Sequence, residues 1–145
     1  MSGWSLQFSR PLVFTNGCFD ILHRGHVDYL ERAGDLGKSL IVGVNSDTSV
    51  KELEKGENRP VNSEQDRAAI LCALECVSGV VIFNEPTPLE IITAINPNVL
   101  VKGGDWSLDN IVGAREVTAN GGEVRSIPFE FELSTSALIE RIRSH

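Results

Sequence analysis

Two histidines, His23 and His26, stand three residues apart in a glycine-containing segment that follows a short apolar run. Residues with this spacing at the start of a helix share one face, so both imidazoles can address the same ligand. Gly25 removes a side chain where the helix begins and leaves backbone N–H groups open to an anion. Such a pair could donate to phosphate oxygens and stabilise charge that builds up in a transition state.

Other interpretations of the pair are a metal site or no function at all. Zinc needs more ligands, and Cys18 is the only nearby candidate. Cys72 and Cys76 lie four residues apart in a predicted helix, and we expect them to be small core-facing side chains. The total of three cysteines is odd, which argues against a disulfide framework. The neighbouring glycines therefore favour a phosphate site without a protein-bound metal.

Two further segments could bind anions. Lys102, Gly103 and Gly104 follow a predicted strand, where the glycines permit a close backbone approach and the lysine supplies a positive charge. Ser134, with Thr135 and Ser136 after it, opens the last predicted helix. Hydroxyls at a helix start can cap the helix and also hold phosphate.

The elements that position these residues alternate in type. We expect strands at 12–15, 40–44, 80–83, 99–101 and 124–127. We expect helices at 25–36, 63–75 and 109–119, a short helix after residue 46, and others from 88 and 134. This alternation predicts an α/β fold with a five-stranded parallel sheet and helices on both faces. Ligands bind such sheets beyond the carboxyl ends of the strands, and the unusual residues follow strands directly.

Composition sets the remaining limits. The 145 residues, 41% hydrophobic, predict one domain with its core at about 12–143. A net charge of −7 argues against nucleic-acid or anionic-membrane partners, which need a basic face. No stretch approaches the ~20 apolar residues that span a bilayer, and the first residues lack a secretory pattern. We therefore expect a cytoplasmic protein.

Residues 17–26 resemble the signature of the cytidylyltransferase-like nucleotidyltransferases, whose H-x-G-H pair grips a triphosphate. Further segments resemble the branch of that family that adenylylates D-glycero-β-D-manno-heptose 1-phosphate. These segments are N-S-D at 45–47, R-P-V-N at 59–62, V-K-G-G-D-W at 101–106, G-G-E-V at 121–124 and S-T-S at 134–136. The resemblance covers about residues 12–143.

This resemblance implies a Rossmann-like nucleotidyltransferase fold and a direct in-line reaction. The sugar 1-phosphate attacks the α-phosphorus of ATP, and pyrophosphate leaves. Mg²⁺ is expected mainly as the metal–nucleotide complex, the product is an ADP-heptose for a surface glycan such as lipopolysaccharide, and a homodimer is expected. Relatives often carry a fused sugar kinase, so a separate kinase is expected to supply the substrate here.

Roles for single residues follow from the motifs and the resemblance together. Catalytic roles are expected for His23, His26 and a loop lysine, either Lys51 or Lys55. Nucleotide contacts are expected from Thr15, Asn16, Gly17, Cys18, Phe19, Gly25, Lys102, Gly103, Asp105, Ser134, Thr135 and Ser136. Substrate contacts are expected from Asp20, Asn45, Arg59 and Arg67. Asp20 could instead orient a histidine or influence Mg²⁺, and Arg67 could serve a subunit contact.

The chain departs from the branch in places. Trp106 replaces a tyrosine, Ser136 replaces a second threonine, and the loop at 51–59 is one residue longer, which leaves Lys51 and Lys55 as alternatives. Competing hypotheses are a cytidylyltransferase acting on an alcohol phosphate such as glycerol 3-phosphate, and a nucleotide-binding module without turnover. A redox Rossmann domain is disfavoured because no G-x-G-x-x-G follows the first strand.

Overall fold

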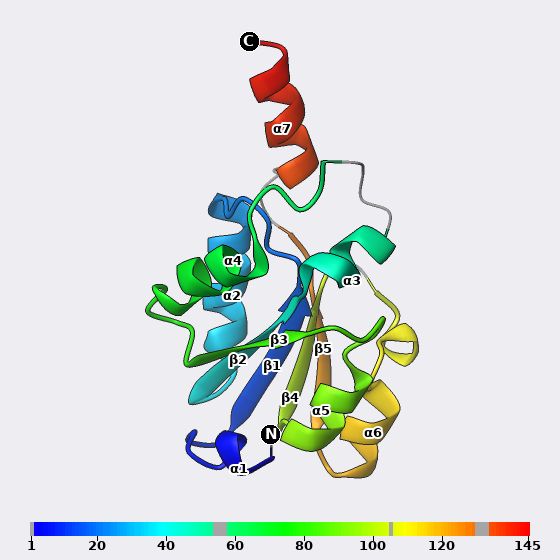
Figure 1. Ribbon diagram of the computed structural model, residues 1–145. Coiled ribbons are helices and arrows are strands. Elements are labelled where there is room, and N and C mark those ends of the chain that lie inside the picture. The colour runs from blue at the N-terminus through cyan, green and yellow to red at the C-terminus, as the bar shows by residue number, and fades with distance from the viewer. Residues whose placement is uncertain (1, 54–57, 105, 130–133) are drawn as a thin grey trace.

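A computed structural model describes residues 2–53, 58–104, 106–129 and 134–145 (Figure 1). Five strands form one sheet in which every neighbouring pair is parallel, in the order β3-β2-β1-β4-β5. Their bounds are β1 Leu12–Gly17, β2 Ser39–Asn45, β3 Gly79–Phe83, β4 Val99–Gly103 and β5 Glu123–Ile127. The predicted five-stranded parallel sheet is confirmed.

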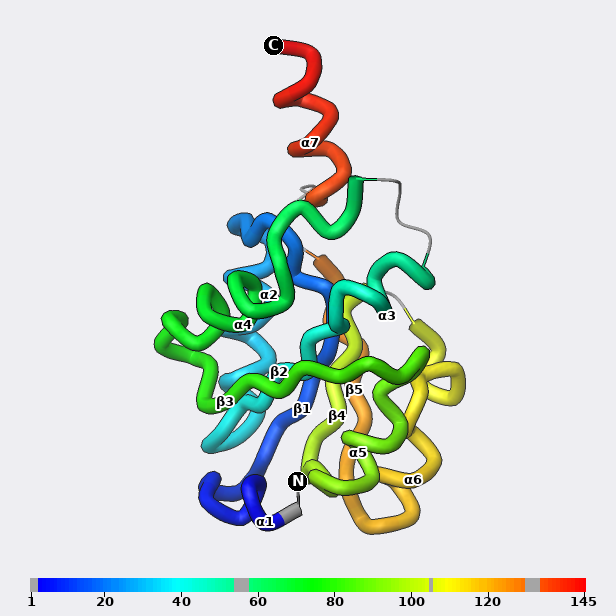
Figure 2. The backbone as a smooth tube through the Cα atoms, viewed as in Figure 1, coloured from blue at the N-terminus to red at the C-terminus, as the bar shows by residue number. Residues whose placement is uncertain are grey.

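Helices cover both faces of the sheet, as expected. The helices are α1 Ser2–Ser5, α2 Arg24–Gly34, α3 Asp47–Glu52, α4 Glu64–Cys72, α5 Leu89–Ile95, α6 Ala114–Ala119 and α7 Thr135–Arg143, with a 3-10 turn η1 at Leu108–Asn110. Figure 2 shows α2 and α4 on one side of the sheet and α5 and α6 on the other. Among the described helices, none is long and apolar enough to cross a membrane.

Alternation along β1 explains the two layers of core. Leu12 and Phe14 pack with residues of α5 and α6, whereas Val13 packs with residues of α2 and α4. Successive side chains of a strand point to opposite faces, so a strand covered on both sides must be apolar throughout. Leu12, Val13 and Phe14 have no exposed surface, and burial of each stabilises the fold by about 1.5–3 kcal/mol.

Serine caps begin three helices, as the sequence predicts. The side chains of Ser46, Ser63 and Ser134 accept hydrogen bonds from backbone N–H groups of α3, α4 and α7. An acceptor at this position satisfies one of the N–H groups that lack a partner inside the helix. The caps place the starts of α3 and α7 at defined points beyond the sheet.

The helix expected at 109–119 is wrong in its first half. The turn η1 ends at Asn110, and α6 begins only at Ala114, after Gly113 at φ 89°. A φ of this sign favours glycine, so Gly113 suits the break in the helix, and a Cβ there would also lie 2.8 Å from the Ile92 side chain.

The expectation for the cysteines also needs correction. α4 ends at Cys72 instead of residue 75, so Cys72 and Cys76 do not share a helix face. Cys72 is exposed and Cys76 is half-buried. Neither is therefore a fully core-facing side chain.

The strand order creates a switch point between β1 and β4. The chain proceeds outward from β1 to β2 and β3 and then returns to β4 on the other side of β1. Connections from adjacent carboxyl ends therefore leave in opposite directions and open a crevice between them. In Figure 1, α7 projects beyond this edge of the sheet.

Candidate active site

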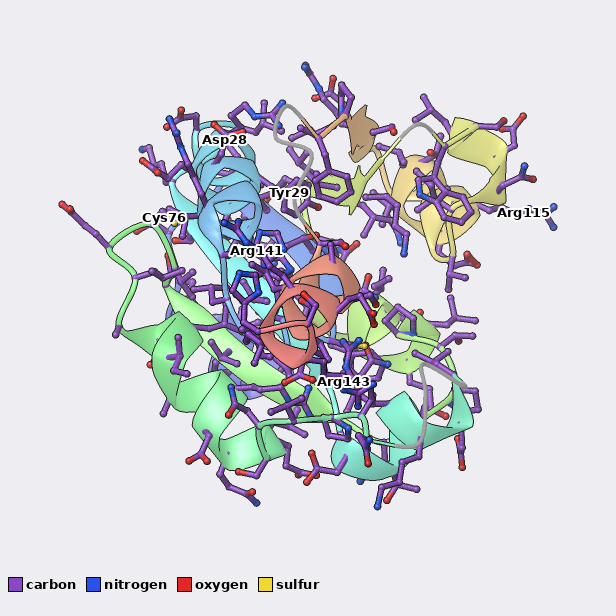
Figure 3. The ribbon with its side chains drawn as sticks, turned by 90° about the horizontal axis from the view of Figure 1, so that it is seen from above. Asp28, Tyr29, Cys76, Arg115, Arg141 and Arg143 are labelled. Carbon is purple, nitrogen blue, oxygen red and sulfur yellow. The ribbon has the colours of Figure 1, made fainter. Side chains whose placement is uncertain are left out.

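A cavity of about 390 Å³ lies at the carboxyl ends of β1 and β4, where the strand order reverses. Figure 3 looks down on this edge, with α7 and its Arg141 and Arg143 in front. The cavity is lined by Asn16, Gly17, Cys18, Phe19, Asp20, His23, His26, Tyr29, Arg59, Lys102, Gly103, Phe129, Ser134, Thr135 and Ser136. Both histidines and the three hydroxyls of the last helix thus meet in one place.

The two imidazoles stack on each other at the start of α2. Their ring centroids are 3.9 Å apart and their planes differ by 23°. Nδ1 of His23 accepts the Gly25 N–H at 3.1 Å, and Nδ1 of His26 accepts the His23 N–H at 3.3 Å. Each histidine therefore caps the helix that carries it.

These backbone contacts set the tautomer of both rings. An imidazole nitrogen that accepts an N–H cannot carry a proton, so a neutral ring holds its proton on Nε2. Burial lowers the pKa of His23 below its usual 6.5 because it penalises the charged ring. The neutral ring with an Nε2–H donor is the form that the site favours at neutral pH.

Gly25 differs from expectation in one respect. Its N–H is engaged by His23 Nδ1, so this amide is not open to an anion, and the residue does not line the cavity. Thr15 is also fully buried, outside the lining, and its hydroxyl is hydrogen-bonded to the hydroxyl of Tyr29. Both residues therefore contact side chains that line the cavity without lining it themselves.

The loop after β1 has an unusual backbone. Phe19 and Ile21 have φ of 49° and 55°, in a region that favours glycine. The Phe19 ring meets the edge of His26 with centroids 5.4 Å apart, and a Cβ on Gly17 would lie 3.0 Å from the same ring. Strained conformations of this kind persist only where surrounding contacts hold them.

Asp20 makes several of the contacts that hold the loop after β1 in this conformation. It is 1% exposed, and its carboxylate accepts Arg59 Nε at 2.9 Å, Val61 N–H at 2.7 Å and Asn62 N–H at 3.0 Å. Burial alone would raise the pKa of Asp20, but the two amides and the guanidinium outweigh it and hold the pKa below 3.8. The carboxylate thus fastens residues 59–62 to the β1 loop.

Arg59 faces the cavity from that fastened segment. Besides its ion pair with Asp20, its Nη1 donates to Ser136 Oγ at 3.4 Å. The hydroxyl of Thr135 donates to the backbone carbonyl of Asp20. The start of α7 is therefore tied to two other walls of the cavity.

The opposite wall follows β4. Lys102 Nζ lies 5.3 Å from the centre of the Trp106 ring, and Trp106 Nε1 donates to the Gly103 carbonyl at 3.0 Å. Gly103 is packed so closely that a Cβ would lie 2.7 Å from the Phe129 ring. Asp105, an expected nucleotide contact, lies outside the described residues.

Arg67 and Asn45 are not brought to the cavity. Arg67 is 1% exposed, and its guanidinium donates to the carbonyls of Cys18, Asn45 and Asn62 and to the Asp47 carboxylate. Asn45 is buried and donates to Ser49 Oγ at 2.9 Å. These contacts join the loops after β1 and β2, so we do not place Arg67 or Asn45 among the substrate contacts.

Of the two candidate loop lysines, only Lys51 is among the described residues. Lys51 is exposed on α3 and is not among the lining residues. Lys55 lies outside the described residues. Across the described ranges, no group of three or more His, Cys, Asp or Glu side chains is arranged to hold a metal ion.

Tyr29 and Phe129 line the cavity but were not predicted. Their rings lie 5.6 Å apart, and burial raises the pKa of Tyr29 to about 12. Tyr29 follows His26 by three residues on the same helix, so helical spacing could have found it. Phe129 comes two residues after β5, and only the general rule for strand ends points to it.

Comparisons with known proteins agree with this geometry. A family described as cytidylyltransferase-like matches residues 14–141. The D-beta-D-heptose 1-phosphate adenylyltransferase of Bordetella bronchiseptica is 54% identical over 94% of this chain and 85% of its own length. The bifunctional protein HldE of Citrifermentans bemidjiense is 53% identical over 93% of this chain, which spans only 28% of that protein.

Solved structures show the same fold. A lipopolysaccharide core biosynthesis protein from Thermoplasma volcanium superposes with a TM-score of 0.66 at 25% identity, covering 82% of this chain and 95% of that one. A pantoate-beta-alanine ligase from Francisella tularensis, crystallised with beta-gamma ATP and beta-alanine, gives a TM-score of 0.63 at 15% identity, over 99% of this chain and 73% of that chain.

Proposed function

Because the chain belongs to the cytidylyltransferase-like family, we propose that it is an adenylyltransferase that joins ATP to D-glycero-β-D-manno-heptose 1-phosphate. The products are ADP-heptose and pyrophosphate. The identity of 54% with an adenylyltransferase named for this acceptor supports the choice of substrates. The bifunctional relatives support the same reaction, although this chain matches only about a quarter of their length.

One observation carries the proposal: His23, His26 and the hydroxyls of residues 134–136 line a single cavity at the switch point. Imidazole N–H groups and hydroxyls are phosphate-binding donors, and they come from opposite ends of the chain. A simple structural role for each group would not require them to meet. A triphosphate is the ligand that uses all of them at once.

The reaction is an in-line attack. An oxygen of the sugar 1-phosphate forms a bond to the α-phosphorus, the bond from that phosphorus to the bridging oxygen breaks, and pyrophosphate leaves with the electron pair. A phosphate is already ionised at neutral pH, so no strong general base is needed. Catalysis then consists of positioning and stabilisation of charge.

The histidine pair is suited to stabilising the charge that develops on the phosphate oxygens. With both Nδ1 atoms engaged by backbone N–H groups, the Nε2–H donors serve the α- and β-phosphate oxygens. Their donor orientation is set before the ligand arrives, so no reorganisation is needed as charge develops. Lys102 and Arg59 add positive charge to the cavity wall.

A loop lysine completes the charge balance. Lys51 or Lys55 would neutralise the leaving pyrophosphate by closing over the cavity from the segment that follows β2. ATP would enter as its Mg²⁺ complex, in which the metal neutralises phosphate charge. The buried Asp20 carboxylate already accepts three protein donors, so we do not assign the metal to it.

The partners follow from the reaction. We propose that a sugar kinase supplies the 1-phosphate, as the family resemblance implies. We also propose that the protein forms a homodimer, as the family resemblance implies. We propose a cytoplasmic location because the substrates are charged. Light scattering on the purified protein tests the dimer.

Pyrophosphate release tests the activity directly. ATP, CTP and GTP are each supplied with heptose 1-phosphate or glycerol 3-phosphate, and release is expected only with ATP and the heptose. Release with CTP and glycerol 3-phosphate would replace the proposal with an alcohol-phosphate cytidylyltransferase. Nucleotide binding without release from any pair would leave a non-catalytic module.

A further inference from the structure

A second cavity of about 130 Å³ adjoins the first on the other side of the strand ends. Asn16 and Lys102 line both cavities. The remaining walls of the small cavity come from the start of α5 and the segment before α6, namely Pro88, Trp106, Asn110, Ile111 and Val112. The two hollows thus meet across the carboxyl ends of β1 and β4.

The two cavities lie over opposite faces of the sheet. The histidines reach the larger one from α2, whose side chains pack on the β1 face that holds Val13. Ile111, on the small cavity, belongs to the core on the face that holds Phe14. A ligand in one cavity therefore approaches Asn16 and Lys102 from the side opposite to a ligand in the other.

The small cavity differs from the large one in chemistry. Lys102 is its only charged side chain among the described lining residues, and none of the histidines or hydroxyls reaches it. It offers an indole, three aliphatic side chains and two primary amides. This combination of a flat apolar surface and a few polar groups suits a polyhydroxylated ring better than a polyphosphate.

Trp106 is presented to this cavity in a fixed orientation. Its Nε1 donates to the Gly103 carbonyl at 3.0 Å, and its backbone N–H donates to Ser126 Oγ at 3.1 Å. The side chain nevertheless remains 49% exposed, so much of the indole surface is available for contact. An amphipathic ring held in this way can pack on the C–H face of a sugar.

We propose that the small cavity binds the sugar ring of the acceptor, with Trp106 as the packing surface and Lys102 at the junction as the contact for the 1-phosphate. The proposal rests on the proposed function and adds a location to it. The acceptor oxygen then reaches the α-phosphorus from the side opposite to the histidines and the departing pyrophosphate. In-line displacement requires this opposed approach.

Steady-state kinetics of Trp106 variants test the location. Trp106→Ala is expected to raise KM for heptose 1-phosphate about ten-fold, as loss of an aromatic packing contact predicts, and to leave KM for ATP unchanged. Trp106→Phe keeps a ring and should restore most of the lost affinity. Leu108→Ala is the matched control, because Leu108 is also exposed on this segment but does not line the cavity.

Fluorescence gives a readout that does not depend on turnover. The chain has two tryptophans, Trp4 and Trp106. Trp4 packs with Phe8 at a ring-centroid distance of 4.9 Å and lines neither cavity. In a Trp4→Phe background the emission reports Trp106 alone. Heptose 1-phosphate, added with a non-hydrolysable ATP analogue and Mg²⁺, should change that emission beyond the analogue alone.

The failures are distinguishable. If the unchanged enzyme releases no pyrophosphate from ATP and heptose 1-phosphate, the proposed function falls. If it turns over normally but Trp106→Ala raises KM only for ATP, the small cavity holds part of the nucleotide and the inference is overturned. Unchanged KM for both substrates, with no change in Trp106 emission, would overturn it as well.

Discussion

The hydroxyl of Thr135 donates a hydrogen bond to the backbone carbonyl of Asp20 across a sequence separation of 115 residues. Thr135 is the buried residue of α7, whereas the rest of that helix is half-buried or exposed. The bond therefore joins the last helix to the loop that carries the histidines. Ser134 and Ser136, which line the cavity, flank this contact on either side.

Thr135→Val removes the hydroxyl and keeps the shape of the side chain. The free energy of unfolding should fall by about 1–3 kcal/mol, because the Asp20 carbonyl loses a buried partner. KM for ATP should rise, since the hydroxyls of α7 lose their position. Denaturant unfolding and initial rates measure the two effects. Ser144→Ala, at the exposed far end of α7, is the control, and equal behaviour of the two variants would contradict the role of Thr135.

Two substitutions at His23 separate capping from catalysis. His23→Asn keeps a side-chain oxygen that can accept the Gly25 N–H, so stability should be retained. His23→Ala removes this cap, so its free energy of unfolding should fall by about 1 kcal/mol. Both remove the Nε2–H donor and should reduce kcat by roughly 10²–10³, and His26→Ala should show a loss of the same size. A folded His23→Asn enzyme with normal kcat would remove His23 from the reaction.

The lowered pKa of His23 predicts a dependence on pH. Unfolded His23 gains its proton near pH 6.5, and the folded residue gains it only at lower pH. In that window the unfolded state binds more protons, so the free energy of unfolding decreases as pH falls below about 6.5. Protonation would also replace the Nδ1 acceptor with a donor facing the Gly25 amide, so kcat should fall on the same side.

Unfolding and turnover measured between pH 7.5 and pH 5 check this dependence. The His23→Asn variant supplies the baseline, because it lacks the titrating ring but keeps the cap. The unchanged protein should lose more stability than this variant as the pH falls. Parallel curves for the two proteins would show that His23 does not carry the effect.

The buried Asp20–Arg59 pair predicts a large loss on truncation. Asp20→Ala would leave the Arg59 guanidinium buried without its carboxylate partner and two backbone amides without their acceptor, so stability should fall by about 3–5 kcal/mol. Asp20→Asn keeps an oxygen acceptor for one of the two amides and should lose less. Urea unfolding of both variants measures the difference, with Asp35→Ala on the surface as the control.

Acid titration checks the same pair without mutation. The pKa of Asp20 is held below 3.8, so its stabilising contribution is present above that value and is lost as the pH falls through the folded pKa. The stability difference between the unchanged protein and Asp20→Asn should therefore shrink at strongly acidic pH. A constant difference would contradict the assignment.

Much of the fold was predictable from the sequence because strands buried on both faces leave short apolar runs. The runs around Val13 and Val42 could hardly form anything but central strands. The rule that ligands bind beyond strand ends then predicted that His23 and Ser134 lie at one site. These inferences need only chain order and the geometry of a parallel sheet.

The partners of buried charges could not be predicted in this way. Arg67 looks like a substrate cation in the sequence, but its donors are taken by carbonyls of three separate segments. Asp20 likewise binds backbone amides far along the chain. Such contacts depend on where loops cross after folding, and neither residue type nor spacing carries that information.

Backbone N–H groups within four consecutive residues fix the tautomers of the stacked histidines. Many enzymes recruit a distant carboxylate to orient an imidazole, and then both partners must be preserved together. Here the turn that carries the rings also determines which nitrogen of each ring holds the proton. The turn should therefore keep this donor pattern when it is transplanted onto another strand-to-helix junction of matching backbone shape.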